Sequence, residues 1–73
     1  MTLAMLKKNT NAEIIALHTD EKLTSRLKSL GLVEGRKIKV IDEVHGNVII
    51  QVMKSRIALN KQTASKLVIK QVS

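Results

Sequence analysis

The chain has 73 residues, a formal net charge of +7, and no cysteine, proline, Phe, Tyr or Trp. This length suits a single domain over residues 1–73 and leaves little room for an enclosed substrate pocket, which needs roughly 300–1,000 Å³. The missing cysteines exclude disulfides and thiolate chemistry, and the missing aromatic rings disfavour a reader of single-stranded RNA. We therefore expect a binding domain that is not an enzyme and holds no cofactor.

The first predicted elements are a strand and an amphipathic helix. The strand is expected at residues 13–17, and Asp20 is a suitable N-cap for the helix that follows. Leu23, Leu27 and Leu30 recur at i, i+4 and i+7, which is the spacing of one apolar helix face. We predict that this face packs against the rest of the domain.

The helix is predicted to end at Gly31. Glycine favours the left-handed conformation that commonly follows the last helical residue, and Leu32 can pack back onto the last turn. Gly35 then predicts a second turn. The six residues from Leu30 to Gly35 therefore form a helix stop and a short bridge to the next strand.

Beyond the bridge, apolar residues alternate with polar ones, as in strands with one buried face. A polar segment at 42–47 predicts a hairpin connection, and 54–55 predicts a tight turn. Asn60 is a plausible cap for a short helix at 61–66. The further strands are expected near residues 38–40, 48–52, 57–59 and 67–70.

These elements predict a mostly β fold with short helices. Short strands without long crossover helices favour a small antiparallel β-barrel. One amphipathic helix is inserted after its first strand, and a short helix precedes its last strand.

Basic side chains dominate the second half of the chain. All six acidic residues lie between Glu13 and Glu43, and only lysine and arginine carry charge after them. Such a surface suits nucleic acid, an anionic membrane or an acidic protein. Together with the apolar bridge, it gives a set of predicted partner-binding residues: Arg26, Leu32, Val33, Lys37, Lys39 and Arg56.

Several predicted strands also carry apolar residues on their outward positions, among them Ile49, Met53, Val68 and Val72. Exposed apolar residues on a small domain often mark a contact surface. Coverage by residues 1–6 or by a second copy of the chain is the competing explanation, so a homo-oligomer is left open.

His18 and His45 are the only residues that we consider as metal ligands. His45 follows Asp42 and Glu43, and this group of oxygen and nitrogen donors could bind a divalent ion. Three nearby polar residues are also ordinary loop content, and His18 lies at a predicted helix start. We therefore expect no metal site.

The segment 26–35, Arg-Leu-Lys-Ser-Leu-Gly-Leu-Val-Glu-Gly, resembles the signature of the FeoA family. The later pieces Ile-Ala-Leu at 57–59 and Ala-x-x-Leu-x-Ile at 64–69 follow in the family's order. The resemblance implies an SH3-like β-barrel. It also implies a bacterial cytoplasmic accessory protein of ferrous iron uptake that binds FeoB, the membrane transporter with a cytosolic GTP-binding domain.

Two alternatives stay open. The positive charge would also suit a nucleic-acid-binding small barrel, although we favour a protein partner. A similar domain ends the iron- and manganese-dependent repressors, so a stand-alone metal-sensing domain is the third hypothesis.

Overall fold

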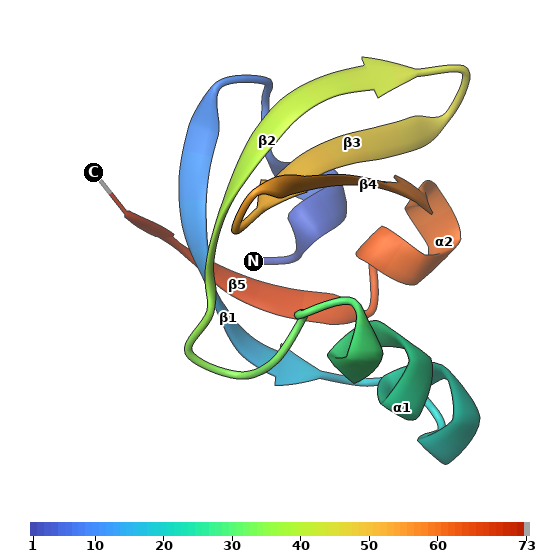
Figure 1. The fold of residues 1–73 in the computed structure, drawn as a ribbon. Coiled ribbons are helices and arrows are strands. Elements are labelled where there is room, and N and C mark those ends of the chain that lie inside the picture. The colour runs from blue at the N-terminus through green and yellow to red at the C-terminus, as the bar shows by residue number, and fades with distance from the viewer. Residues whose placement is uncertain (73) are drawn as a thin grey trace.

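The chain folds around one curved antiparallel sheet with the strand order β4-β3-β2-β1-β5 (Figure 1). The computed structural model describes residues 1–72. Three helical segments accompany the strands, and the arrangement confirms the predicted mostly β fold with helices after the first and before the last strand. The elements are η1 (Leu3–Met5), β1 (Thr10–Leu17), α1 (Glu21–Ser29), β2 (Lys37–Val44), β3 (Asn47–Val52), β4 (Ser55–Asn60), α2 (Lys61–Ala64) and β5 (Leu67–Val72).

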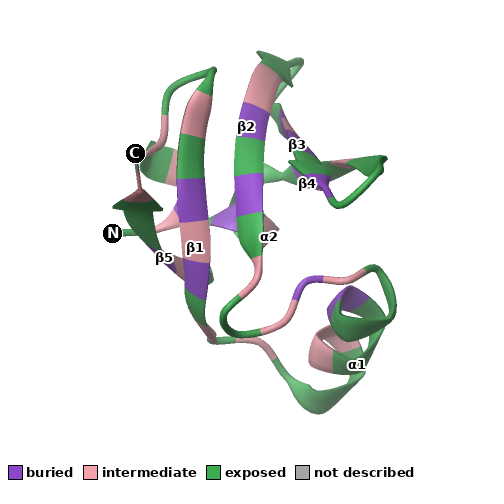
Figure 2. Ribbon diagram, turned by 60° about the vertical axis from the view of Figure 1, so that its left-hand side comes forward, coloured by how far each residue is buried: buried purple, intermediate pink, exposed green. Residues whose placement is uncertain are grey.

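Alternating side chains build the core from the inner face of the sheet. Buried and exposed bands alternate along β2 in Figure 2, where Ile38 and Val40 face inward while Lys37 and Lys39 face solvent. The core is aliphatic, and each fully buried Leu, Ile or Val contributes about 1.5–3 kcal/mol. Its largest fully buried side chains are Leu3, Ile14, Leu27, Leu32, Val40, Ile50, Val52 and Leu67.

Local hydrogen bonds fix both ends of α1. The Asp20 carboxylate accepts the backbone N–H of Leu23 at 2.8 Å, as the N-cap prediction requires. At the other end, Gly31 has a φ of +93°, and the N–H of Leu32 donates to the carbonyl of Leu27 at 3.0 Å. This is the six-residue bond of a Schellman motif, so the predicted glycine stop is confirmed.

Only part of the predicted apolar face of α1 is buried. Leu27 is buried and Leu23 is half-buried, whereas Leu30 is 45% exposed. The prediction that all three leucines pack on the domain is therefore wrong for Leu30. The reason is the Schellman turn, which makes Leu30 the C-cap and reverses the chain so that Leu32 enters the core instead. Figures 1 and 2 both show α1 set to one side of the sheet.

The first hairpin loop is shorter than predicted. It consists of His45–Gly46 alone, with φ values of +50° and +78°. Positive φ at both positions is the requirement of a type I′ turn. Residues 42–44 therefore belong to β2, where they pair with β3 although they are polar or exposed.

The second hairpin turn lies one residue earlier than predicted. Val52 pairs with Ser55, which leaves Met53–Lys54 as the turn in place of 54–55. Met53 takes a φ of +58°, and its side chain is 65% exposed.

The first six residues cover the free edge of β5. Thr2 forms an isolated antiparallel bridge with Val68, and the N–H of Ile69 donates to the carbonyl of Met1 at 2.9 Å. Leu3 is fully buried in the core. In residues 1–72, no helix is long and apolar enough to cross a membrane.

Candidate partner-binding surface

Four of the predicted partner-binding residues gather on or beside the outer side of β2, β3 and β4. The register places Lys39 opposite Gln51 and Gln51 opposite Arg56, so these side chains form a row across three strands. Neighbours in such a row stand about 5 Å apart. Two residues away from Lys39 and Gln51, Lys37 and Met53 continue the surface, and all four side chains line one shallow hollow. We name Lys37, Lys39, Gln51, Met53 and Arg56, all of which are exposed, the basic sheet face.

Two carboxylates lie beside this face: Glu34 lines one hollow with Lys37 and Met53, and Glu13 lies on the neighbouring strand. Glu13 on β1 is opposite Lys37 on β2 and also opposite Lys70 on β5. Glu13 therefore stands between two lysines, and the cations of the outer surface outnumber the two acids. The basic sheet face keeps a positive excess that can attract an acidic partner.

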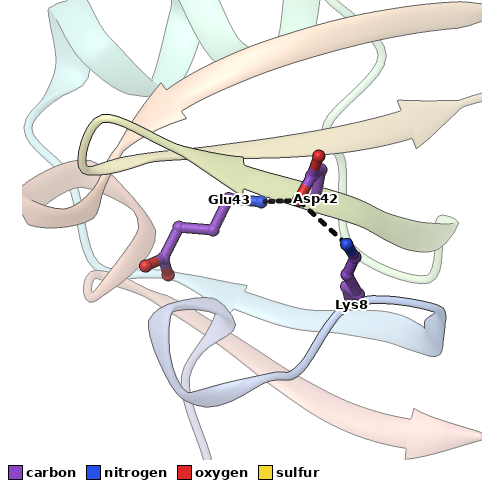
Figure 3. A network of polar contacts seen from close by, with 3 residues as sticks. All are labelled: Lys8, Asp42 and Glu43. Atoms are coloured by element: carbon purple, nitrogen blue, oxygen red, sulfur yellow. Dashed lines mark hydrogen bonds and ion pairs between the residues drawn. The ribbon is translucent and has the colours of Figure 1, made fainter.

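Two other acids are paired with lysines at the far end of β2. Figure 3 shows Asp42 3.6 Å from the ammonium of Lys8 while it accepts the backbone N–H of Glu43 at 2.8 Å. The carboxylate of Glu43 lies 3.2 Å from Lys61. These pairs are solvent-exposed, so each contributes about 0–1 kcal/mol. Because each of these two acids is balanced by a lysine, the positive excess lies at the opposite end of the sheet, on the basic sheet face.

The two histidines lie apart. His45 occupies the tip of the first hairpin, and His18 is exposed at the end of β1, where its backbone N–H donates to the carbonyl of Lys66. Within the described part of the chain, no three His, Asp or Glu side chains gather as metal ligands would. The structure therefore does not bring together the ligand group considered for His45.

Of the two bridge residues that were predicted to bind a partner, one lies at the surface. Val33 is half-buried and lines a shallow hollow with Lys37 and Met53, next to the basic sheet face. Leu32 has no exposed surface. The prediction that Leu32 contacts a partner is wrong, because the Schellman turn directs its side chain into the core.

Arg26 lies on a different surface. Its side chain lines a groove of about 250 Å³ between α1 and β4, together with Leu23, Leu30, Ile57 and Ala58. We name this feature the α1–β4 groove. The sequence predicted no groove here, because helical periodicity shows which residues share a face but not how closely that face approaches its neighbour.

Comparison with known proteins decides the family. The FeoA domain family matches residues 1–71 of the chain. This chain belongs to the FeoA family. The family comprises non-enzymatic accessory proteins associated with ferrous iron transport, so the predicted family and the predicted absence of enzyme activity are both confirmed.

Solved structures of FeoA proteins share this fold. An iron uptake regulatory protein, FeoA, superposes with a TM-score of 0.90 at 22% identity, covering 99% of this chain and 96% of its own. A FeoA protein from Chlorobium tepidum has a TM-score of 0.94 at 23% identity, covering 100% of this chain and 71% of its own.

A third structure is the FeoA protein of Stenotrophomonas maltophilia complexed with zinc, described as a prokaryotic SH3 domain protein. It is 28% identical, with a TM-score of 0.78, and the match covers 96% of this chain and 89% of its own. A sequence comparison with curated proteins gives no match.

Proposed function

We propose that this FeoA family member is a cytoplasmic accessory protein that binds the cytosolic parts of a FeoB-type ferrous iron transporter through its basic sheet face. The observation that carries the proposal is the row of Lys39, Gln51 and Arg56 across three strands of a FeoA-family barrel. The S. maltophilia relative, described as a candidate activating factor of ferrous iron transport, supports the same class of role.

The chemistry of the face suits a folded or extended acidic protein surface. Lysine and arginine side chains on neighbouring strands stand on a hydrogen-bonded sheet, so the backbone beneath them does not have to become ordered on binding. Met53 and the half-buried Val33 add apolar area beside the charges. Binding through such a face biases the assembly or the nucleotide cycle of the transporter without any covalent step.

The test is a binding measurement with the purified full-length transporter in detergent or nanodiscs, with and without guanine nucleotide. A variant carrying Lys37→Gln, Lys39→Gln and Arg56→Gln should bind about tenfold more weakly. Three exposed ion pairs at about 0.5 kcal/mol each amount to that factor. Added salt should weaken the wild type more than the variant.

The matched control carries Lys22→Gln, Lys28→Gln and Lys66→Gln, which removes the same charge from exposed positions outside the face. It should bind like the wild type. Absence of binding with either nucleotide state would refute the proposal, and so would equal losses in both variants. Retention of duplex DNA at low salt, with a steep salt dependence, would favour the nucleic-acid alternative.

A further inference from the structure

One edge of the sheet is covered by other residues of the chain, and the opposite edge is not. The edge of β5 is covered by residues 1–6 through the bridge of Thr2 with Val68 and the bond from Ile69 to Met1. β4 is the opposite edge and, among the residues that the structure describes, pairs only with β3. An uncovered edge presents backbone donors and acceptors that a further strand can use.

The register shows which backbone groups of β4 are free. Ser55 directly follows a two-residue turn and lies opposite Val52, so the antiparallel alternation directs the N–H and C=O groups of Ser55 and Ile57 toward β3. Those of Arg56 and Ala58 then point away from it. Within residues 1–72, no turn, loop or cap hydrogen bond reaches either residue. Ala58 is exposed, and its methyl group leaves the backbone accessible.

The α1–β4 groove lies beside this edge. Leu23 from the helix, Leu30 at its C-cap and Ile57 from the strand give it an apolar lining, and Leu30 is 45% exposed. Side chains of a strand alternate between its two faces, so every second residue of an added strand would point toward the groove.

We propose that the free edge of β4 and the α1–β4 groove together bind an extended peptide segment of another protein that alternates apolar and acidic residues. Main-chain hydrogen bonds to Arg56 and Ala58 align the segment, and its apolar side chains enter the groove. This is recognition by strand addition.

The charges at the site explain why the bound peptide should contain acidic residues. Arg26 lines the groove and Arg56 is on the edge strand, and neither takes part in an ion pair within the described chain. The groove lining contains no carboxylate. Guanidinium groups bind carboxylates through two parallel hydrogen bonds, so acidic residues on the outward side of the added strand match Arg56, whose side chain lies on that side of the sheet.

The same charges disfavour a second copy of the chain as the occupant. Two β4 edges related by a two-fold axis would bring the Arg26 and Arg56 side chains of both copies to one interface. Like charges across strands are destabilising. The chain is also positive overall, at +7.

The experiment selects a phage-displayed library of random octapeptides on the immobilised full chain. Enriched peptides should carry apolar residues at alternate positions and at least one acid. Synthetic copies should bind with the backbone amides of Arg56 and Ala58 shifted in nitrogen–proton NMR spectra and protected from hydrogen exchange.

Two variants and two controls test whether the peptide binds along the edge of β4 and in the α1–β4 groove. Ala58→Pro removes an outward N–H but spares the ladder with β3, and Leu30→Lys places a charge at the groove; each should weaken peptide binding at least tenfold. Ala58→Thr keeps the N–H, and Ser25→Lys adds the same charge on α1 away from the groove; both should bind like the wild type.

The proposal is overturned if no peptide is enriched above bare matrix, or if binding survives both Ala58→Pro and Leu30→Lys in folded protein. It is also overturned if sedimentation shows a dimer that Ala58→Pro dissociates, because the occupant is then a second copy. Arg56 belongs to both surfaces, but the two proposals are tested separately, because Ala58→Pro and Leu30→Lys leave Lys37, Lys39 and Arg56 unchanged and the probe is a peptide, not FeoB.

Discussion

Leu32 and Val33 are neighbours in the chain, but their side chains have different environments. Leu32 is fully buried, whereas Val33 is half-buried beside Lys37 and Met53. The sequence predicted the glycine turn that precedes them and the packing of Leu32 onto the last helical turn, but it also named both residues as contacts for a partner. A Schellman motif requires an apolar contact from the second residue after the C-cap, and this requirement identifies Leu32 as the buried one.

Substitutions at these two positions should therefore differ in effect on stability. Leu32→Ala should lower the free energy of unfolding by about 2–5 kcal/mol, since it leaves a cavity in the core. Val33→Ala should cost about 1 kcal/mol or less. Urea unfolding followed by far-UV circular dichroism measures both, as the chain has no aromatic fluorophore.

Leu32→Met is the control for this pair, because it nearly conserves volume and should cost less than about 1.5 kcal/mol. Equal losses for Leu32→Ala and Val33→Ala would contradict the assignment of Leu32 to the core.

Among the elements, α1 is the one least integrated with the sheet. Its only buried residue is Leu27, and its ends are fixed by the Asp20 cap and the Gly31 turn. By contrast, α2 has only one turn but buries Ala64 and joins β4 to β5. The N-caps of both helices and the stop of α1 could be predicted from local chemistry, whereas α2 ends at Ala64, two residues before its predicted end.

The placement of α1 could not be predicted, because it depends on contacts that are distant in sequence. The same holds for the hairpin ends. Val52 opposite Ser55 fixes the second turn at Met53–Lys54, and no local signal selects that register over its neighbour.

Removal of the N-cap of α1 should affect hydrogen exchange in that helix alone, whereas removal of the N-cap of α2 should also affect the sheet. Asp20→Ala should speed hydrogen exchange of the α1 amides about fivefold, which corresponds to a loss of about 1 kcal/mol at an N-cap. The amides of β1 and β5 should be unchanged, because α1 opens locally. Asn60 caps α2, because its side-chain amide oxygen accepts the backbone N–H of Thr63 at 2.7 Å.

Asn60→Ala is the comparison, and it should lower protection throughout the sheet, since α2 is part of the connection between two strands. Hydrogen exchange read by NMR separates the two results. Uniform acceleration of the whole chain by Asp20→Ala would show that α1 is as integrated as the strands.

At the scale of the whole molecule, charge is distributed unevenly over a rigid barrel. Acids at the far end of β2 are paired with Lys8 and Lys61, while the basic sheet face carries Lys37, Lys39 and Arg56 beside two carboxylates, Glu13 and Glu34. The sequence predicted that the surface would be basic and named these three cations. The sequence alone did not show that these cations lie on one face, because their arrangement depends on how β2, β3 and β4 pair. The same pairing places Gln51 and Met53 on that face.

Ferrous iron uptake by living cells tests the central claim, that the protein supports transport through its basic sheet face. A strain lacking this protein should recover uptake of radiolabelled ferrous iron when it carries the wild type or the Lys22→Gln, Lys28→Gln, Lys66→Gln control. The Lys37→Gln, Lys39→Gln, Arg56→Gln variant, present at equal level and folded by circular dichroism, should fail to restore it. Normal uptake in the deletion strain, or full recovery with the triple variant, would contradict the claim.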